Sequence, residues 1–324
     1  MVDFIGIGSP FVDYFFEGNN SFLKLHKLKP EDDIVFKDRK KLTLKSLRES
    51  LPFLSQSTGG ISINTTVVLA TLKIHTGYYG DIGNDILGKS FKKSLKKIDL
   101  SHVTSHGAMS ICACILTDNR KKRLFISQVN PLEQSFFENL DFSYLEQAKI
   151  IHISPFFHKP KVAIKNCSKM LEKLKKPKIS FSPAMIYCAY GLSVLKPILM
   201  RTHILFVNSD EIRMLTKKTP KTGSKMLLSF GIETIVCTLG ENGVLITNNK
   251  TQFIVSQKKV KKIIDSTGAG DSFAAGFLYG MLNGKTARES AVLGNKLALL
   301  ALSDFGQHWL KTQNKKITQL LKTV

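Results

Sequence analysis

The stretch DSTGAGDSFAAGFLYGML, from Asp265 to Leu282, joins a glycine-containing turn to an apolar, helix-like segment. Glycines let the backbone turn sharply and come close to a ligand. The apolar residues that follow recur at helical spacing, so we predict a helix over residues 269–282. The first N–H groups of a helix have no partner within it and lie at the positive end of its dipole. We therefore expect the amides of Gly268, Ala269 and Gly270 to bind an anion.

Asp271 lies in the first turn of this predicted helix, beside the expected anion site. An acid is unfavourable there if the site only binds phosphate, but it fits a base that accepts the proton of a hydroxyl attacking a phosphoryl group. The neighbouring amides would then stabilise the charge on the transferred group. The alternative is an acidic residue that the helix dipole merely favours.

Apolar, β-rich segments alternate with helical patterns along most of the chain. Candidate strands cover residues 4–7, 150–153, 204–207 and 235–238, and candidate helices cover 62–72, 87–97, 161–175, 269–282 and 286–302. This alternation predicts an α/β fold with a central, mostly parallel sheet and helices on both faces. No repeat or low-complexity linker divides the chain, so we expect a single domain over residues 1–324.

Two stretches interrupt the alternation. Residues 12–52 are rich in polar residues with only short strand-like pieces, and residues 106–128 have the pattern of a β-hairpin with its turn at Asp118-Asn119-Arg120. We expect the two stretches to form a small β-sheet lid, which could close over a substrate and exclude water.

The net charge of +22 raises the question of a nucleic-acid partner. Lysines make up 40 of the 47 basic residues and are scattered over the whole length, without the interleaved aromatic residues of a single-strand binding platform. This pattern favours a solvated, lysine-rich surface. Nucleic acid is therefore an unlikely partner, although the positive field would attract anionic substrates.

The sequence also gives expectations about the cellular setting. No run of 18 apolar residues is present, and the N-terminal segment carries Asp3 without the basic residues of a signal peptide. The five cysteines are odd in number and contain no C-x-x-C pair, which fits a reducing cytoplasm. We expect a cytoplasmic protein without a membrane partner.

Residues 265–276 resemble the second signature of the PfkB, or ribokinase-like, carbohydrate kinases. Five further motifs resemble this family in its own order: Ser57–Gly60 with Asn64, residues 80–88, Asn208–Glu211, Thr238–Gly240 with Gly243, and Gly294-Asn295. The resemblance covers nearly the whole chain and implies a ribokinase-like fold and a phosphotransferase that uses ATP and Mg²⁺. It implies that Glu211 orients the metal through water and that the nucleotide contacts Asn208, Thr238, Gly240, Gly243 and Asn295.

Within that family the chain is most similar to adenosine kinases. Residues 21–32 and the hairpin around Cys112–Ile115 resemble the lid of those enzymes, and Pro155-Phe156-Phe157 falls where they carry a phenylalanine pair. The resemblance implies that the Phe157 ring stacks on the purine, which suits an aromatic face. Taken alone, both phenylalanines also fit core positions at a strand end. Ser9 and Met185 depart from the adenosine kinase pattern, which usually has an asparagine and an aromatic residue there.

The resemblance implies an acceptor site built from Ser9, Asp13, Gly59, Gly60 and Asn64 around the ribose, and from Leu124, Ile126 and Phe157 around the base. Asp271 would then deprotonate the 5′-hydroxyl, with the amides of residues 268–270 stabilising the charge. A sugar kinase acting on ribose, fructose or a related sugar is the nearest alternative. A more distant one is a non-catalytic nucleic-acid-binding protein. The expected partners are ATP and a small-molecule acceptor, and the expected state is a monomer or homodimer.

Overall fold

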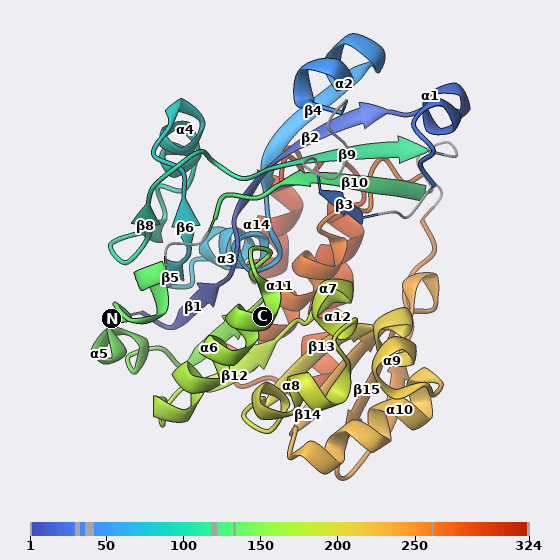
Figure 1. Ribbon diagram of the computed structural model, residues 1–324. Coiled ribbons are helices and arrows are strands. Elements are labelled where there is room, and N and C mark those ends of the chain that lie inside the picture. The colour runs from blue at the N-terminus through green and yellow to red at the C-terminus, as the bar shows by residue number, and fades with distance from the viewer. Residues whose placement is uncertain are drawn as a thin grey trace.

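A nine-stranded sheet forms the body of the protein in the computed structural model, which describes residues 2–29, 33–35, 42–117, 122–131, 134–260 and 262–322 (Figure 1). The strands lie in the order β16 (Gln252–Val255), β15 (Val244–Asn248), β14 (Thr234–Thr238), β13 (Ile204–Asn208), β12 (Lys178–Phe181), β11 (Ile150–Ile153), β1 (Phe4–Ile7), β5 (Thr76–Tyr79) and β7 (Ile98–Asp99). All neighbours pair in parallel except β14 with β15 and β15 with β16, which are antiparallel. In open α/β sheets, ligands bind beyond the carboxyl ends of the parallel strands.

Helices cover both faces of this sheet because alternate strand residues are apolar on both sides. Ile5 and Ile151 pack with one set of helices, namely α6 (Pro160–Lys173), α7 (Ala184–Cys188), α8 (Gly191–Leu199), α9 (Ser209–Thr216) and α10 (Pro220–Leu227). Phe4 and Ile150 pack with the other set, which includes α3 (Ile61–Thr71), α11 (Ala269–Leu282), α12 (Ala287–Ala301) and α14 (Asn314–Lys322). The period of two along each strand thus supplies two separate cores.

A second, five-stranded sheet lies above the body in Figure 1, next to the helices α1 (Asn20–Leu25) and α2 (Leu44–Ser50). Its strands lie in the order β3 (Asp33–Val35), β10 (Lys122–Gln128), β9 (Ile111–Thr117), β2 (Phe11–Glu17) and β4 (Phe53–Gly59). β9 and β10 pair antiparallel as a hairpin, whose predicted turn at residues 118–120 lies outside the described residues. The small sheet places Asp13 and the hairpin strands over one end of the body.

The two faces of the small sheet differ in what they contact. Val12, Tyr14 and Phe16 point into a core that also contains residues of α1, α2, α3 and α4 (Ile86–Ser94). Phe15 points the other way, into a small cluster with Cys114, where Phe125 and Phe305 also pack. Asp13 lies on the same face as Phe15, since side chains alternate along a strand. This face meets the segment that leads into α11.

The sequence-based expectation of a mostly parallel α/β sheet with a smaller second sheet is confirmed. The predicted strands at 4–7 and 150–153 match β1 and β11 residue for residue, and the predicted helix at 269–282 matches α11. The other candidate helices differ from the observed ones by one to three residues at an end.

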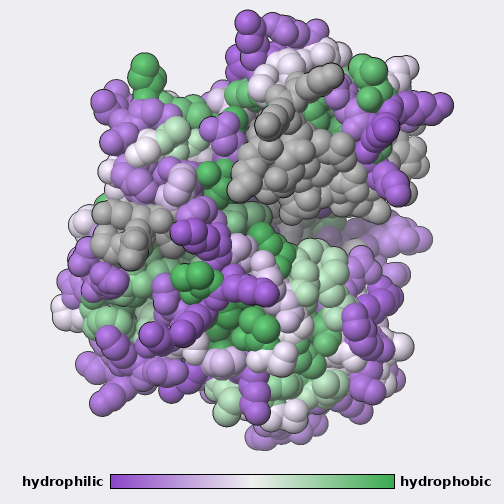
Figure 2. Space-filling view, in the orientation of Figure 1, coloured by the Kyte–Doolittle hydropathy of each residue, from purple (hydrophilic) through white to green (hydrophobic). Residues whose placement is uncertain are grey.

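Hydrophilic residues cover much of the face of the molecule that Figure 2 shows. Figure 2 shows them spread over both the upper and the lower part of the visible face, with smaller hydrophobic areas between them. This distribution agrees with a solvated, lysine-rich surface. Within the described ranges, no helix combines the length and apolar character needed to cross a membrane.

Candidate active site

The turn before α11 creates an open helix N-terminus. Gly268 caps the helix with φ 75° and ψ 1°, a left-handed conformation that glycine adopts without the steric penalty of a side chain. The first hydrogen bond of helical spacing runs from the Ser272 amide to the Gly268 carbonyl at 2.8 Å. The amides of Ala269, Gly270 and Asp271 precede it, and that of Ala269 also contacts the Ser266 carbonyl at 3.3 Å. This end of α11 therefore presents N–H groups and the positive dipole end to a ligand.

The carboxyl group of Asp271 is held in a fixed position at this helix end. Asn64, from α3, donates a 2.8 Å hydrogen bond from Nδ2 to Oδ2 of Asp271. Thr65 donates to the Asp271 backbone carbonyl at 3.3 Å. Burial raises the pKa of Asp271 to about 7, against the opposing effects of the Asn64 hydrogen bond and the Arg123 charge. A general base with a pKa near the working pH is well matched to proton transfer.

Asp13 is buried opposite this helix end, and Gly59 leaves the room for it. A Cβ atom built on Gly59 would lie 2.1 Å from the Asp13 carboxyl carbon, so any side chain would displace the acid. Burial, and after it the charges of Asp265 and Asp271, raise the pKa of Asp13 to about 8. Gly60, with φ 105°, caps the start of α3, and a Cβ built on it would lie only 2.5 Å from the Ser9 carbonyl oxygen. The residues predicted around the ribose, namely Ser9, Asp13, Gly59, Gly60 and Asn64, are thus brought together.

The two phenylalanines that follow β11 have different environments. Phe156 is 1% exposed and belongs to the core beneath the sheet, as the alternative interpretation predicted for both rings. Phe157 is only partly buried, and its amide donates to the Ser9 hydroxyl at 3.2 Å. Its ring packs edge-on against Phe11 of β2 at a centroid distance of 5.0 Å. Phe157 therefore lies beside the other acceptor residues, at the carboxyl ends of β1 and β11.

Leu124 and Ile126 correct the prediction for the base pocket. Both are fully buried in the core on the far face of the small sheet, away from Asp13. The register explains this placement, because Leu124 pairs with Ile115 and Ile126 pairs with Ala113, and both partners belong to the same core. The alternate residues of β10, Arg123 and Phe125, lie on the opposite face of the small sheet, towards the turn before α11.

Arg123 is a candidate site residue that the sequence interpretation missed. From β10 its guanidinium donates a hydrogen bond to the Ser266 hydroxyl in the turn before α11. Burial raises the pKa of Asp271 and of Asp265, and the Arg123 charge opposes this rise at both carboxyl groups. A cation from the small sheet thus reaches the helix end where a phosphoryl group would bind. The signal was the strict alternation of β10, which places Arg123 and Phe125 on the face opposite Leu124.

A cavity of about 350 Å³ lies on the other side of the same helix end. Six of the residues predicted for the catalytic loop and the nucleotide site line it, namely Thr238, Gly240, Gly243, Ala269, Gly270 and Asn295. Lys258 and Lys259 add positive charge, and an apolar wall is formed by Val260, Ile263, Phe273, Ala298 and Leu302. An apolar wall with nearby cations and helix amides suits a nucleotide, which combines a flat base with phosphates.

Three of the residues predicted to contact the nucleotide or the metal, Asn208, Glu211 and Asn295, form hydrogen bonds within the protein. Asn295 donates from Nδ2 to the carbonyls of Val255 and Ser256, at 3.3 and 3.1 Å, and so fixes the cavity wall. Asn208 and Glu211 form a capping box at the start of α9, in which each side chain accepts the other's backbone N–H at 2.9 Å. Neither lines the cavity. Burial raises the pKa of Glu211 to about 7.

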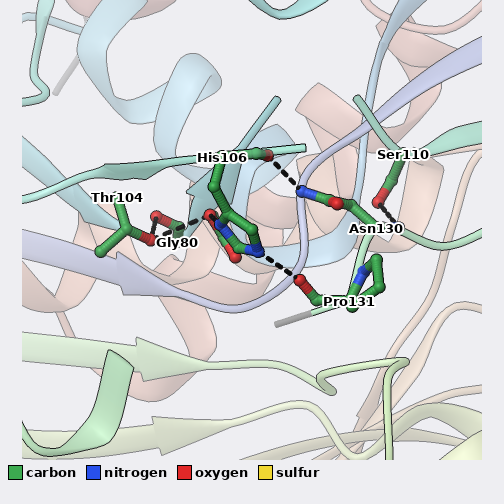
Figure 3. Close-up of polar contacts among 7 residues, drawn as sticks. Gly80, Thr104, His106, Ser110, Asn130 and Pro131 are labelled. Carbon is green, nitrogen blue, oxygen red and sulfur yellow. Dashed lines mark hydrogen bonds and ion pairs between the residues drawn. The ribbon is translucent and has the colours of Figure 1, made fainter. Parts of the chain in front are cut away.

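The base of the small-sheet hairpin is tied to the body by one histidine (Figure 3). His106 contacts the Asp81 carboxylate through Nδ1 at 2.8 Å and the Pro131 carbonyl through Nε2 at 2.7 Å. Asn130 donates to the His106 carbonyl at 2.9 Å, which links the segment before β9 to the segment after β10. This cluster holds the segments before β9 and after β10 together where the two strands leave the body.

Comparisons with known proteins agree with this geometry. Residues 38–309 match the model of the pfkB family of carbohydrate kinases. The chain is 29% identical over 240 residues to an uncharacterized sugar kinase of Archaeoglobus fulgidus, which covers 74% of this chain and 95% of that protein.

Two solved structures share the fold. The adenosine kinase of Sinorhizobium meliloti superposes with a TM-score of 0.82 at 20% identity, over 97% of this chain and 99% of that one. The nucleoside kinase of Methanocaldococcus jannaschii, described as an archaeal member of the ribokinase family, superposes with a TM-score of 0.71 at 20% identity, over 100% and 99%. The ribokinase-like fold is thereby confirmed. The chain belongs to the pfkB family of carbohydrate kinases and is a phosphotransferase that acts on an alcohol group.

Proposed function

We propose that this kinase transfers the γ-phosphate of ATP to the 5′-hydroxyl of a nucleoside, with adenosine as the first candidate. The position of Asp271 carries the proposal. Its carboxyl group is held by Asn64 on the acceptor side, while the adjoining residues Ala269 and Gly270 line the nucleotide cavity. The N-terminus of α11 thus lies between the acceptor residues and the nucleotide cavity, and the phosphoryl group would pass from the cavity to the acceptor.

In the proposed mechanism the acceptor hydroxyl lies against Asp271. The carboxylate takes the proton as the oxygen attacks the γ-phosphorus, and the bond from that phosphorus to the β-γ bridging oxygen breaks to release ADP. The amides at the start of α11 and the Arg123 guanidinium stabilise the charge on the transferred group. Asp13 and Asn64 orient the acceptor, and most of the rate gain comes from positioning and electrostatics.

Glu211 is the residue that would hold a magnesium ion. It is 9% exposed, and one of its carboxyl oxygens, Oε2, accepts the Asn208 N–H. In the described part of the chain, no cluster of three or more acidic, histidine or cysteine side chains could form a complete metal cage. Magnesium commonly binds to one or two carboxylates, several waters and the substrate phosphates, so a contact from Glu211 through water fits. The ion would neutralise charge on the phosphates.

A nucleoside is favoured over a free sugar by the aromatic residues beside Ser9. Phe157 and Phe11 form an edge-on pair at the carboxyl ends of β1 and β11, next to the acceptor glycines. Such a pair offers a flat base more contact than it offers a free sugar. The resemblance to an uncharacterized sugar kinase supports the second candidate, a kinase for ribose, fructose or a related sugar.

An acceptor screen separates these candidates. ADP release is measured with adenosine, cytidine, ribose, fructose and fructose 6-phosphate, for the wild type and for Phe157→Ala. We expect nucleoside turnover and a KM for the nucleoside that rises about tenfold or more in Phe157→Ala, from the loss of roughly 1.5 kcal/mol or more of aromatic contact. Phe142→Ala, a change at a partly buried ring near Lys173, serves as the control and should leave KM unchanged. Turnover of sugars alone would replace the nucleoside assignment by the second candidate.

A further inference from the structure

Gln307 has a buried side-chain amide without hydrogen-bond partners. The residue lies between α12 and α13 (Trp309–Thr312) and is 7% exposed. Neither Nε2 nor Oε1 has a partner among the described residues, and the same holds for Oδ1 of Asn64. Buried polar groups in native proteins are nearly always paired, so an exception calls for an explanation such as an absent ligand.

The unpaired amide lies at the head of the catalytic helix. A Cβ built on Gly268 would lie 3.4 Å from Gln307 Nε2, 3.6 Å from Asn64 Nδ2 and 3.9 Å from Asp271 Oδ2. Because glycine has no side chain, the space above Gly268 is left to these three polar groups. We call this space the Gly268 nook. This space adjoins both the Asp271 carboxylate, which is the proposed general base, and the amides at the start of α11. A reacting hydroxyl has to lie between such groups.

The backbone around Gln307 holds its side chain in place. The Gln307 amide donates to the Ser57 hydroxyl at 2.9 Å, and the Gly306 amide donates to Asp265 at 3.2 Å. Gly306 has φ 49°, and a Cβ there would lie 2.6 Å from the Ser57 side chain. Trp309 is fully buried just beyond. The amide therefore approaches the nook from a rigid segment that contacts both the small sheet and the catalytic turn.

We propose that Gln307 is an acceptor-binding residue whose side-chain amide holds the hydroxyl group that Asp271 deprotonates. This inference rests on the proposed kinase function, but it does not depend on which acceptor is used. Nε2 donates a hydrogen bond to the attacking oxygen while the proton of that oxygen goes to Asp271. As negative charge develops on the oxygen, the hydrogen bond strengthens, so the contact acts mainly in the transition state.

The Gln307→Met variant tests the proposal because methionine has a similar volume without the polar amide. We expect kcat to fall about 10²-fold, as for the loss of one preorganised donor, with the KM for ATP unchanged. The melting temperature should stay the same or rise by a few degrees, because an unpaired polar group has been replaced by an apolar one of the same shape. A residue with a purely structural role would lose stability instead.

Two further variants make the result specific. Gln307→Glu removes the donor and adds a negative charge beside Asp271, so the pH midpoint of kcat should move upward. Ser290→Ala is the matched control. Its hydroxyl is also buried and unpaired, but it packs against Gly280, nine residues or about 13 Å along α11 from Asp271. We expect Ser290→Ala to keep wild-type kinetics.

The outcomes distinguish this inference from the proposed function. If no nucleoside is turned over, the nucleoside assignment fails, and Gln307→Met is assayed with whichever sugar of the screen is active. Wild-type kcat in Gln307→Met overturns the role of Gln307, whatever the acceptor. A melting temperature clearly below that of the wild type overturns it without any acceptor, because the amide would then be satisfied in the unliganded fold.

Discussion

Replacement of Asp271 by asparagine should strongly reduce kcat and, near and above neutral pH, stabilise the fold. Asparagine keeps an oxygen that can accept the Asn64 hydrogen bond, but it cannot take up a proton from the acceptor. Since a general base typically contributes 10²–10⁴-fold, we expect kcat to fall by at least about a hundredfold. In the wild type, kcat should rise with pH to a plateau, with a midpoint near the Asp271 pKa of about 7.

The stability effect follows from the same pKa. Burial raises the pKa of Asp271 from 3.8 to about 7, so the folded state holds its proton over a pH range in which the unfolded chain has lost it. The stability that this group contributes is full below pH 4, falls as the pH rises, and is lost above about pH 7. The difference between the two pKa values corresponds to at most roughly 4 kcal/mol of unfolding free energy. Asparagine does not ionise and escapes this loss.

Urea unfolding of both proteins at pH 5 and pH 8 measures the effect. Asp271→Asn should gain stability over the wild type between pH 5 and pH 8, by roughly 2–3 kcal/mol. Glu49→Gln is the control, because Glu49 is an exposed acid on the surface of α2 that pairs with Lys45. It should show no such gain. Equal pH dependence in Asp271→Asn and the wild type would refute the claim that Asp271 is held in an unfavourable environment.

Three other substitutions test the rest of the site. Gly59→Ala puts a methyl group where the Asp13 carboxyl lies, so the KM for the acceptor should rise about tenfold or more while the KM for ATP stays unchanged. Arg123→Gln removes the cation beside the catalytic turn, and steady-state kinetics should show kcat reduced at least tenfold with its pH midpoint moved upward, because the charge no longer lowers the pKa of Asp271. Gly243→Ala forces a side chain into φ 91° and to within 2.1 Å of a β16 carbonyl, so ATP binding measured by calorimetry should weaken while acceptor binding persists.

The sequence predicted the elements that carry the site better than it predicted which side chains meet. The turn and helix at residues 265–282 were identifiable because glycine and helical spacing act locally. The contact between Asn64 and Asp271 joins residues 207 positions apart, and only the family resemblance suggested that they share a site. Their distance and the resulting pKa required the structure.

The error at Leu124 and Ile126 has a definite physical cause. Leu124 and Ile126 were expected to contact the nucleobase because they are apolar, but apolar side chains are equally suited to a protein core. Side chains alternate along β10, so one face of the strand packs into the core and the other faces the site. Pairing of β10 with β9 decides the choice, because it aligns Leu124 with Ile115 on the core side. Arg123 is thereby directed to the catalytic turn. A register of this kind depends on a partner strand, so it cannot be read from one segment.

Several buried polar groups at the site lack the favourable partners that stabilise such groups in a folded protein. Elsewhere buried and half-buried acids are paired or cap helices, as Asp85 does by accepting the Gly88 amide at the start of α4. Asp13 and Asp271 instead have pKa values raised to about 8 and about 7 by burial, and the amide of Gln307 is buried without a partner. Each of these features lowers the stability of the unliganded protein. All of them border the space between the acceptor residues and the head of α11, where a bound polar acceptor would satisfy them, so substrate binding can offset this loss of stability.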